Sequence, residues 1–171
     1  MATHQGDSVV HEERLQVQCR RIEPNQTIAL RHAVLWPDYP LSQVILSEDA
    51  EGWHFGAFIP LEEEAVAVIS LFAENCPIDD TGTSDNEAST PHKAVRFRKF
   101  ACSPSYQGLG IGTQLLSHVA SVARAELGGD TIWCDARTSS LDWYRRRGLE
   151  PFGKPFYKGP VEYTRMKMDI W

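Results

Sequence analysis

The chain has 171 residues, of which 42% are hydrophobic, and carries a formal net charge of −6. This length suits one ordinary domain, and the hydrophobic fraction is enough for a real core. The acidic balance argues against a dedicated nucleic-acid-binding protein, which usually has a basic excess.

No targeting segment is visible in the sequence. The first 14 residues are polar and predict a disordered tail rather than a signal peptide. No uncharged apolar run approaches the length of a membrane span. Cys19, Cys76, Cys102 and Cys134 stand far apart, so we expect reduced thiols and no disulfide framework. These features favour a cytoplasmic protein, with the nucleus as an alternative and no membrane partner.

The first half of the chain predicts a strand, a helix and a hairpin. The strand covers residues 15–22, where apolar and polar residues alternate. Asn25 can cap a helix that runs to about Trp36, with Ile28, Ala29, His32 and Leu35 on one side. The aromatic, proline-rich connection that follows has little regular pattern. Residues 53–59 and 65–72 predict the two strands of the hairpin.

Residues 74–92 differ from their surroundings, because Asp, Thr, Ser, Asn, Gly and Pro dominate there. Such a composition cannot bury much apolar surface and predicts a mobile loop between two strands. Neither flank is self-sufficient, so we expect one domain over residues 15–171 with this loop inserted.

The second half predicts strands and helices in alternation. A strand over 94–102 leads into a helix over 110–127, whose apolar stripe is Ile111, Leu115, Val119, Val122 and Ala123. "TIWCDA" predicts a short strand, and "SSLDWYRRRG" a compact helix in which Ser139 and Asp142 match a capping box. Two strands follow, at about 150–156 and 163–170. The element order indicates a mixed α/β (α+β) domain.

Gly108, Gly110 and Gly112 lie at the start of the longest predicted helix, although each glycine costs about 1 kcal/mol in a helix interior. A strand that turns through glycines into a helix N-terminus makes an anion site, because free amides and the helix dipole point at the ligand. Two phosphate motifs fail on spacing: a P-loop needs Lys after its last glycine, and a dinucleotide fingerprint needs G-x-G-x-x-G. The pattern Q/R-x-x-G-x-G/A fits Gln107, Gly110 and Gly112.

Three segments carry a family resemblance: "KFACSPSYQGLGIGTQLL", "WCDARTSSLDWYRRRGLEPFG" and the terminal "YTRMKM". Together they resemble the GNAT superfamily of CoA-dependent N-acetyltransferases, with the likeness in element order running from about Leu15 to Trp171. "LRHAVLWPDYP" looks like the start of an uncharacterised branch. The resemblance implies a central mixed, mostly antiparallel sheet of six to seven strands with about four helices.

The resemblance also implies acetyl-CoA as cosubstrate. Amides from Gln107 to Thr113 would hold the pyrophosphate, and the strand ending at Cys102 would pair with the pantetheine arm, with a donor near Phe100–Cys102 for the acetyl oxygen. The residues assigned to the cofactor are Phe100, Ala101, Cys102, Gln107, Gly108, Leu109, Gly110, Ile111, Gly112, Thr113 and Ser139. Arg145–Arg147 are typical of a solvated helix end; contact with the adenosine 3′-phosphate is the alternative.

Tyr144 is the candidate general acid, since it resembles the tyrosine of the family's "FYxxxGF" segment. A phenol with a pKa near 10 stays protonated at neutral pH and can protonate a leaving thiolate. The alternative is a core aromatic on the same helix face as Leu141. The general base stays open between Asp135, His54 and a water chain. No His, Cys, Asp or Glu spacing suggests a metal site.

The acceptor pocket is expected among Trp36, Tyr39, Tyr157 and Tyr163, together with Phe156. These aromatics favour a small-molecule amine slightly over a protein amine. The sequence thus predicts an acetyl-CoA-dependent N-acetyltransferase that works by direct transfer in a ternary complex, as a monomer or homodimer, with no nucleic-acid partner. Two alternatives are a CoA-binding sensor without catalysis and a nucleotide-binding protein that uses the same loop.

Overall fold

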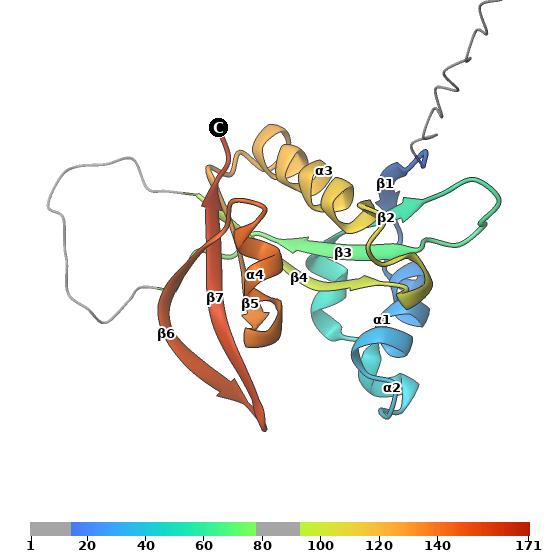
Figure 1. The fold of residues 1–171 in the computed structure, drawn as a ribbon, viewed down its shortest axis with the longest axis horizontal. Helices are drawn as coiled ribbons and strands as arrows, with labels where there is room; N and C mark the ends of the chain where they lie inside the picture. Colours follow the sequence, from blue (N-terminus) through green and yellow to red (C-terminus); the bar gives the residue numbers. More distant parts are fainter. Residues whose placement is uncertain (1–14, 78–92) are drawn as a thin grey trace, which may run out of the picture.

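A seven-stranded sheet forms the centre of the protein (Figure 1). The structure is a computed structural model that describes residues 15–77 and 93–171. Its strands are β1 (Gln18–Ile22), β2 (Trp53–Phe58), β3 (Ala67–Phe72), β4 (Ala94–Cys102), β5 (Thr131–Arg137), β6 (Glu150–Lys158) and β7 (Val161–Asp169). They lie in the order β1-β2-β3-β4-β5-β7-β6, and the pair β4–β5 is parallel while every other neighbouring pair is antiparallel. The expected mixed, mostly antiparallel sheet is confirmed.

Helices cover both faces of this sheet. They are α1 (Ile28–Leu35), α2 (Leu41–Val44), α3 (Ile111–Ala125) and α4 (Leu141–Arg145). In Figure 1, α3 lies above β3, while α1 and α2 lie below the sheet. The connection before β2, for which little regular pattern was expected, contains α2 and a 3-10 turn at Ser47–Glu51.

The main core lies between α3 and the sheet. All five residues of the predicted α3 stripe are buried, and they pack among Phe55, Ile69 and Phe97 from three strands. Burial of each large apolar side chain contributes about 1.5–3 kcal/mol. The stripe therefore fixes which face of α3 meets the sheet, and with it the direction in which the helix N-terminus points.

In the helix layer on the other face of the sheet, α1 does not bury the side that the apolar pattern predicts. Ala29, which the sequence groups with Ile28, His32 and Leu35, is exposed, and Arg31 is fully buried instead. Its guanidinium donates to the Asp49 carboxylate at 2.7 Å and to the Ser70 hydroxyl at 2.8 Å. An apolar pattern could not reveal this face, because a charged side chain occupies its centre.

Both predicted helix caps are wrong. The first helix begins with a 3-10 turn at Pro24–Thr27, and Glu23, not Asn25, forms the capping box there with Gln26. A second 3-10 turn (Thr138–Ser140) precedes α4, so Ser140 is the N-cap and caps with its backbone alone. Asp142 instead lies 3.4 Å from the Arg145 guanidinium.

The four cysteines are free thiols, as expected. Within residues 15–77 and 93–171, no helix combines the length and the apolar character that crossing a membrane requires. The predicted tail at 1–14 and most of the predicted loop at 74–92 lie outside the described residues. The described start of that loop is packed, since Glu74 pairs with Arg96 and Arg98 of β4.

Candidate active site

The two parallel strands separate after a short contact. β4 and β5 pair over Ala94–Arg96 and Thr131–Trp133, and no further pairing between them occurs in the described residues. Beyond this point β4 stays with β3 as far as Cys102, whereas β5 stays with β7 as far as Arg137. A wedge-shaped gap therefore opens in the sheet, and the β4 edge that faces it has backbone groups without a strand partner.

A bulge in β4 lies beside this gap. Ser70 of β3 is opposite Arg98, but Val68 is opposite Ala101, so Lys99 and Phe100 share one position of the ladder. Lys99 adopts a positive φ of 56°, a strained conformation for a residue with a side chain. Bulges redirect side chains and twist a strand locally. This one occurs where the β4 edge loses its neighbour.

The glycine loop and α4 enclose a cleft of about 600 Å³, which we call the loop cleft. Its walls are formed by Phe100, Cys102, Tyr106, Gln107, Gly108, Gly110, Ile111, Gly112, Thr113, Ser140, Trp143, Tyr144, Arg146 and Arg147. Gly108 and Gly110 both have φ of 79°, which a side chain would strain. The chain thus needs glycine here to turn from β4 into α3.

The N-terminus of α3 opens into the loop cleft. Gly110 is its N-cap, and no side chain of the described residues caps the first turn. The Arg147 guanidinium donates to the Thr113 hydroxyl at 2.8 Å and lies 3.5 Å above the Trp143 ring. Free amides, the positive end of a 15-residue helix and two arginines at the wall suit a pyrophosphate. The residues present therefore fit the phosphates of CoA.

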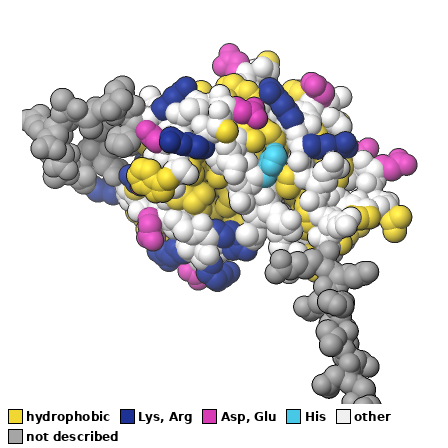
Figure 2. Space-filling view, turned by 90° about the horizontal axis from the view of Figure 1, so that it is seen from above, with side chains coloured by type: hydrophobic (Ala, Val, Ile, Leu, Met, Phe, Trp, Pro, Cys, Tyr) yellow, Lys and Arg dark blue, Asp and Glu magenta, His cyan; other side chains and the backbone are white. Residues whose placement is uncertain are grey.

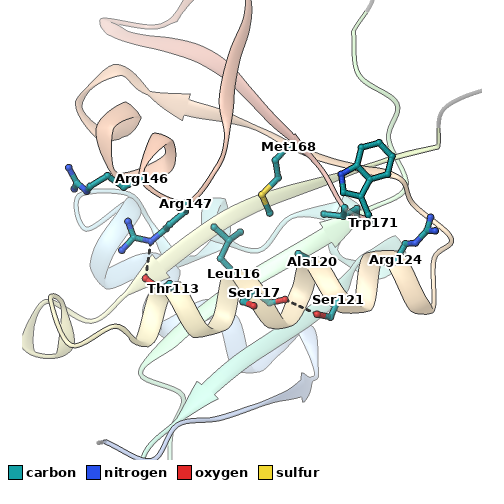
Figure 3. A pocket seen from close by; sticks show the side chains of 11 residues that line it. Thr113, Leu116, Ser117, Ala120, Ser121, Arg124, Arg146, Arg147, Met168 and Trp171 are labelled. Carbon is teal, nitrogen blue, oxygen red and sulfur yellow. Dashed lines mark hydrogen bonds between the residues drawn. The ribbon is translucent and has the colours of Figure 1, made fainter. Parts of the chain in front are cut away.

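A groove continues from the loop cleft along α3 (Figure 3). This helix groove has a volume of about 620 Å³ and shares Thr113, Arg146 and Arg147 with the loop cleft. α3 forms one side of it, and Met168 and Trp171 lie on the other. Seen from above, this side of the molecule carries Lys and Arg side chains next to exposed hydrophobic surface (Figure 2).

A third cleft, of about 480 Å³, lies between α1, β4, β5 and the β6–β7 pair; we call it the strand cleft. It is lined by Val34, Leu35, Trp36, Leu46, Glu48, Arg96, Phe97, Arg98, Lys99, Phe100, Cys134, Asp135, Ala136, Arg137, Ser140, Tyr144, Lys158 and Tyr163. Phe100, Ser140 and Tyr144 line the loop cleft as well. The two clefts therefore meet at the gap between β4 and β5.

Tyr144 lies at this meeting point. Its ring packs against Phe97 with centroids 5.8 Å apart. Burial, reinforced by the neighbouring Cys134, raises the pKa of Tyr144 well above its usual value. Burial and the Asp135 carboxylate likewise raise the pKa of the Cys134 thiol. Both groups consequently hold their protons at neutral pH.

Ion pairs fill much of the strand cleft. Asp135 accepts from Arg96 and, at 2.7 Å, from Lys158. Lys99 lies 3.2 Å from Glu48, and the pKa of Lys99 is lowered by burial. A backbone hydrogen bond and the nearby Lys99 hold the pKa of the Glu48 carboxyl below its usual value. Glu48, with 39% of its side chain exposed against 10% for Asp135, is the more accessible carboxylate.

His54, one of the candidate bases, does not line any of these clefts. It is 2% exposed and bonded through its two ring nitrogens to the Ser70 hydroxyl at 2.7 Å and to the Asp49 carbonyl at 2.8 Å. Burial lowers the pKa of His54, so it is neutral at pH 7. His54 of β2 therefore belongs to the buried hydrogen-bond network with Ser70 and Asp49 and not to a cleft.

Most of the predicted site residues line the two clefts. Among the predicted cofactor residues, Ala101, Leu109 and Ser139 do not line the loop cleft, and Ser140 takes the place of Ser139. Trp36 and Tyr163 line the strand cleft, whereas Tyr39 and Tyr157 lie outside it and are 55% and 66% exposed. The sequence analysis did not predict Glu48, Trp143 or Lys158, and it gave a phosphate contact of Arg145–Arg147 only as the alternative; Arg146 and Arg147 line the loop cleft. One signal in the sequence was available. Arg96 and Arg98 are two residues apart in one strand and Asp135 and Arg137 in another, and this spacing puts the charged side chains of each strand on one face of the sheet.

Comparison with known proteins decides the family. The model of the acetyltransferase (GNAT) family matches residues 18–149. The chain belongs to this family. As a GNAT-family protein it is an acyl-CoA-dependent N-acetyltransferase. In the described ranges, no group of three or more His, Cys, Asp or Glu side chains is arranged to hold a metal ion.

Individual relatives agree with this family. The chain is 28% identical over 142 residues to the uncharacterized N-acetyltransferase YitI of Bacillus subtilis (strain 168). The aligned region covers 82% of this chain and 87% of that protein. Among solved structures, the N-acyl amino acid synthase FeeM from uncultured soil microbes has a TM-score of 0.67 at 15% identity, over 91% and 92% of the two chains. An aminoglycoside 6′-N-acetyltransferase complexed with coenzyme A has a TM-score of 0.66 at 13% identity, over 90% and 97%. At these identities the two structures show the fold alone.

Proposed function

We propose that this GNAT-family protein transfers the acetyl group of acetyl-CoA to the primary amine of a small molecule, by direct attack in a ternary complex. The observation that carries the proposal is the meeting of the loop cleft and the strand cleft at Tyr144. One ligand reaching this point from each cleft would bring two reacting groups together without a covalent enzyme intermediate.

The loop cleft supplies what the donor needs. The first-turn amides of α3, with Arg146 and Arg147, would hold the phosphates, and the open edge of β4 near Phe100–Cys102 would pair with the extended arm. The helix groove is continuous with this site and would take the adenosine end. When bound, acetyl-CoA supplies an activated acetyl thioester.

Tyr144 is placed to act as the general acid. The amine nitrogen forms the new bond to the acetyl carbon, the carbon–sulfur bond breaks, and the thiolate takes a proton. Since the raised pKa keeps the Tyr144 hydroxyl protonated, that side chain can give the proton. The proton released by the amine would leave through the strand cleft, where Glu48 is the accessible carboxylate.

The cysteines of the clefts support direct transfer. Cys134 lines the strand cleft and Cys102 the loop cleft. Burial raises the pKa of both thiols. A thiol attacks a thioester as the thiolate, so neither cysteine suits a covalent acetyl-enzyme route at neutral pH.

The size of the strand cleft favours a small acceptor. At about 480 Å³ it falls in the range of small-molecule pockets, and Trp36 and Tyr163 form part of its wall. A protein amine would need an open groove that admits a whole peptide segment.

Calorimetric titration of the purified protein tests the donor half of this proposal. We expect acetyl-CoA to bind and ATP and NAD, as controls, not to bind. Incubation with acetyl-CoA and a panel of amines, followed by mass detection of acetylated products, tests the transfer. A folded sample that does not bind acetyl-CoA would refute the assignment. A sample that binds it and acetylates no amine would favour a CoA-binding sensor.

A further inference from the structure

The strand cleft is basic although the whole chain is acidic. Five basic and two acidic side chains line it, in a protein whose net charge is −6. The basic ones come from three strands and the acidic ones are Glu48 and Asp135. A cleft with this excess attracts anions and repels cations, and its low-dielectric walls strengthen the effect.

The two carboxylates of the cleft are already engaged by the protein. Asp135 is shared by Arg96 and Lys158, and the Arg165 Nε lies 3.9 Å from its other oxygen. Glu48 pairs with Lys99 at 3.2 Å. Glu74 also pairs with Arg96 and Arg98, and Asp49 with Lys99, so the cations of β4 are compensated and the excess positive charge of the lining remains at Arg137.

Arg137 offers uncompensated charge, and Lys158 is a half-exposed cation that shares the Asp135 carboxylate with Arg96. Arg137 is exposed, and it makes no ion pair with any residue of 15–77 or 93–171. It lies opposite Tyr163 in the β5–β7 ladder, and the Lys158 ammonium lies 4.8 Å from the same Tyr163 ring. The two cations thus flank one aromatic side chain at the end of the cleft formed by the β6–β7 pair.

The remaining groups lie on two sides of the cleft. Tyr144 and Phe100 lie at the β4–β5 gap, where the loop cleft begins. Arg137 and Lys158 lie on β5 and β6, beside Tyr163 of β7. A ligand that spans the cleft would present an amine to the gap and an anionic group to these cations.

We propose that the acetyl acceptor is an amine that also carries a carboxylate, of the class of free amino acids, with the carboxylate bound by Arg137 and Lys158. This inference rests on the proposed N-acetyltransferase function and narrows its substrate. It excludes polyamines and other polycationic amines, because the cleft would repel their additional charges. A guanidinium and a carboxylate form a charge-assisted, bidentate contact that also orients the substrate.

The test compares acceptors that differ in one charge. Free L-amino acids with apolar, aromatic and polar side chains are each assayed beside the corresponding L-amino acid amide, with acetyl-CoA saturating. The amide retains the side chain and the amine but lacks the carboxylate. We expect kcat/KM to be at least about tenfold higher for the preferred free amino acid than for its amide, the factor that one modest ionic contact supplies.

Arg137→Gln and Lys158→Gln then locate the contact. Each is expected to raise the KM of the preferred amino acid about tenfold, with little change in kcat, in acetyl-CoA affinity or in the rate with the amide. Arg21→Gln is the matched control, because Arg21 is an exposed arginine of β1, far from both clefts, and should leave all of these constants unchanged.

The outcomes separate the two proposals. Amides or polyamines acetylated as well as amino acids would overturn the carboxylate inference while the N-acetyltransferase function stands. Equal effects of the Arg137 and Arg21 variants would overturn the assigned contact. Acetyl-CoA binding without acetylation of any amino acid would also overturn the substrate class, whereas a protein that does not bind acetyl-CoA would refute the function beneath it.

Discussion

Tyr144 combines two properties that a general acid needs. It lines both the loop cleft and the strand cleft, so it lies between the proposed donor and acceptor sites. It is also packed against Phe97, and burial raises its pKa, so the hydroxyl is protonated at neutral pH. Phe100 and Ser140 line both clefts as well, and among these three side chains Tyr144 alone carries a phenol.

Tyr144→Phe should lower kcat about a hundredfold, the usual scale for the loss of a general acid, with acetyl-CoA affinity nearly unchanged. Steady-state kinetics and calorimetry on the same sample measure both. The wild-type rate should not decline between pH 7 and pH 9 through this group, since the pKa of Tyr144 is raised and the phenol stays protonated over that range. A variant with nearly full turnover would show that water protonates the leaving group and that Tyr144 only packs.

At the scale of elements, the junction of β4 and α3 forms the donor site. Gly112 lies in the first turn of α3, and a Cβ built there would be 3.4 Å from both Phe100 and Trp143. These two rings are wall residues of the loop cleft, with centroids 5.7 Å apart. A large side chain at position 112 would therefore occupy space in the loop cleft that the ligand needs.

Gly112→Leu should reduce acetyl-CoA affinity by at least about a hundredfold, because the added side chain must enter the cleft or displace an aromatic wall. Gly112→Ala is the matched control: its single methyl meets the two rings at a tight contact distance and also favours the helix by about 1 kcal/mol. We expect the alanine variant to bind acetyl-CoA within about tenfold of wild type. Titration of both variants, with melting curves to confirm folding, decides the matter. Equal affinities would remove the loop cleft from the donor site.

The sequence predicts best the elements whose signal is local. The range of β4 and the apolar stripe of α3 agree with the structure because alternation and a 3.6-residue period act within one segment. The sequence did not predict the burial of Arg31 or the cap of α4, because their signals are not local to one segment. The burial of Arg31 depends on Asp49, Ser70 and His54 from three other segments, and no periodicity within α1 encodes them.

The candidate site shows the same division. The glycine loop and Tyr144 can be recognised as motifs, whereas the strand cleft is assembled from α1, the connection before β2, strands β4 to β7 and α4. The excess of basic over acidic side chains in its lining could not be recognised in a chain with net charge −6, because these residues come from segments far apart in the sequence. Only the register, which places Asp135 opposite Arg165 and Arg137 opposite Tyr163, brings these side chains together.

For the whole molecule, the buried network beneath the sheet makes stability depend on pH. Burial lowers the pKa of His54 from 6.5, so this side chain is neutral in the folded protein. Below about pH 6.5 the unfolded chain therefore binds a proton at His54 that the folded chain does not bind, and the free energy of unfolding decreases. The pKa of Asp49, despite its burial, is lowered from 3.8 by Arg31 and Lys99, so its contribution is lost only as the pH falls below about 4. Acidification therefore destabilises the fold in two successive pH ranges, first through His54 below about pH 6.5 and then through Asp49 below about pH 4.

We expect the melting temperature to fall steadily from pH 6.5 to pH 5, and the fall to become shallower in His54→Gln, which cannot take up the proton. Calorimetric scans at closely spaced pH values compare the two proteins. The variant should be less stable than wild type at pH 7, because it loses bonds to Ser70 and to the Asp49 carbonyl. Parallel curves for the two proteins would show that His54 does not set the dependence.

The short contact between β4 and β5 also has a mechanical meaning. Strands β1–β4 and strands β5–β7 form two plates of the sheet, joined at one end of the seam by three residue pairs of the ladder and by the Arg96–Asp135 ion pair beside them. Elsewhere along the seam no backbone hydrogen bond of the described ladder holds the plates together, and the proposed ligands would occupy that space. Donor and acceptor would then act as removable cross-links, and each would make the spacing between the plates more favourable for the other. Binding of the two substrates should accordingly be cooperative, through the seam that they share.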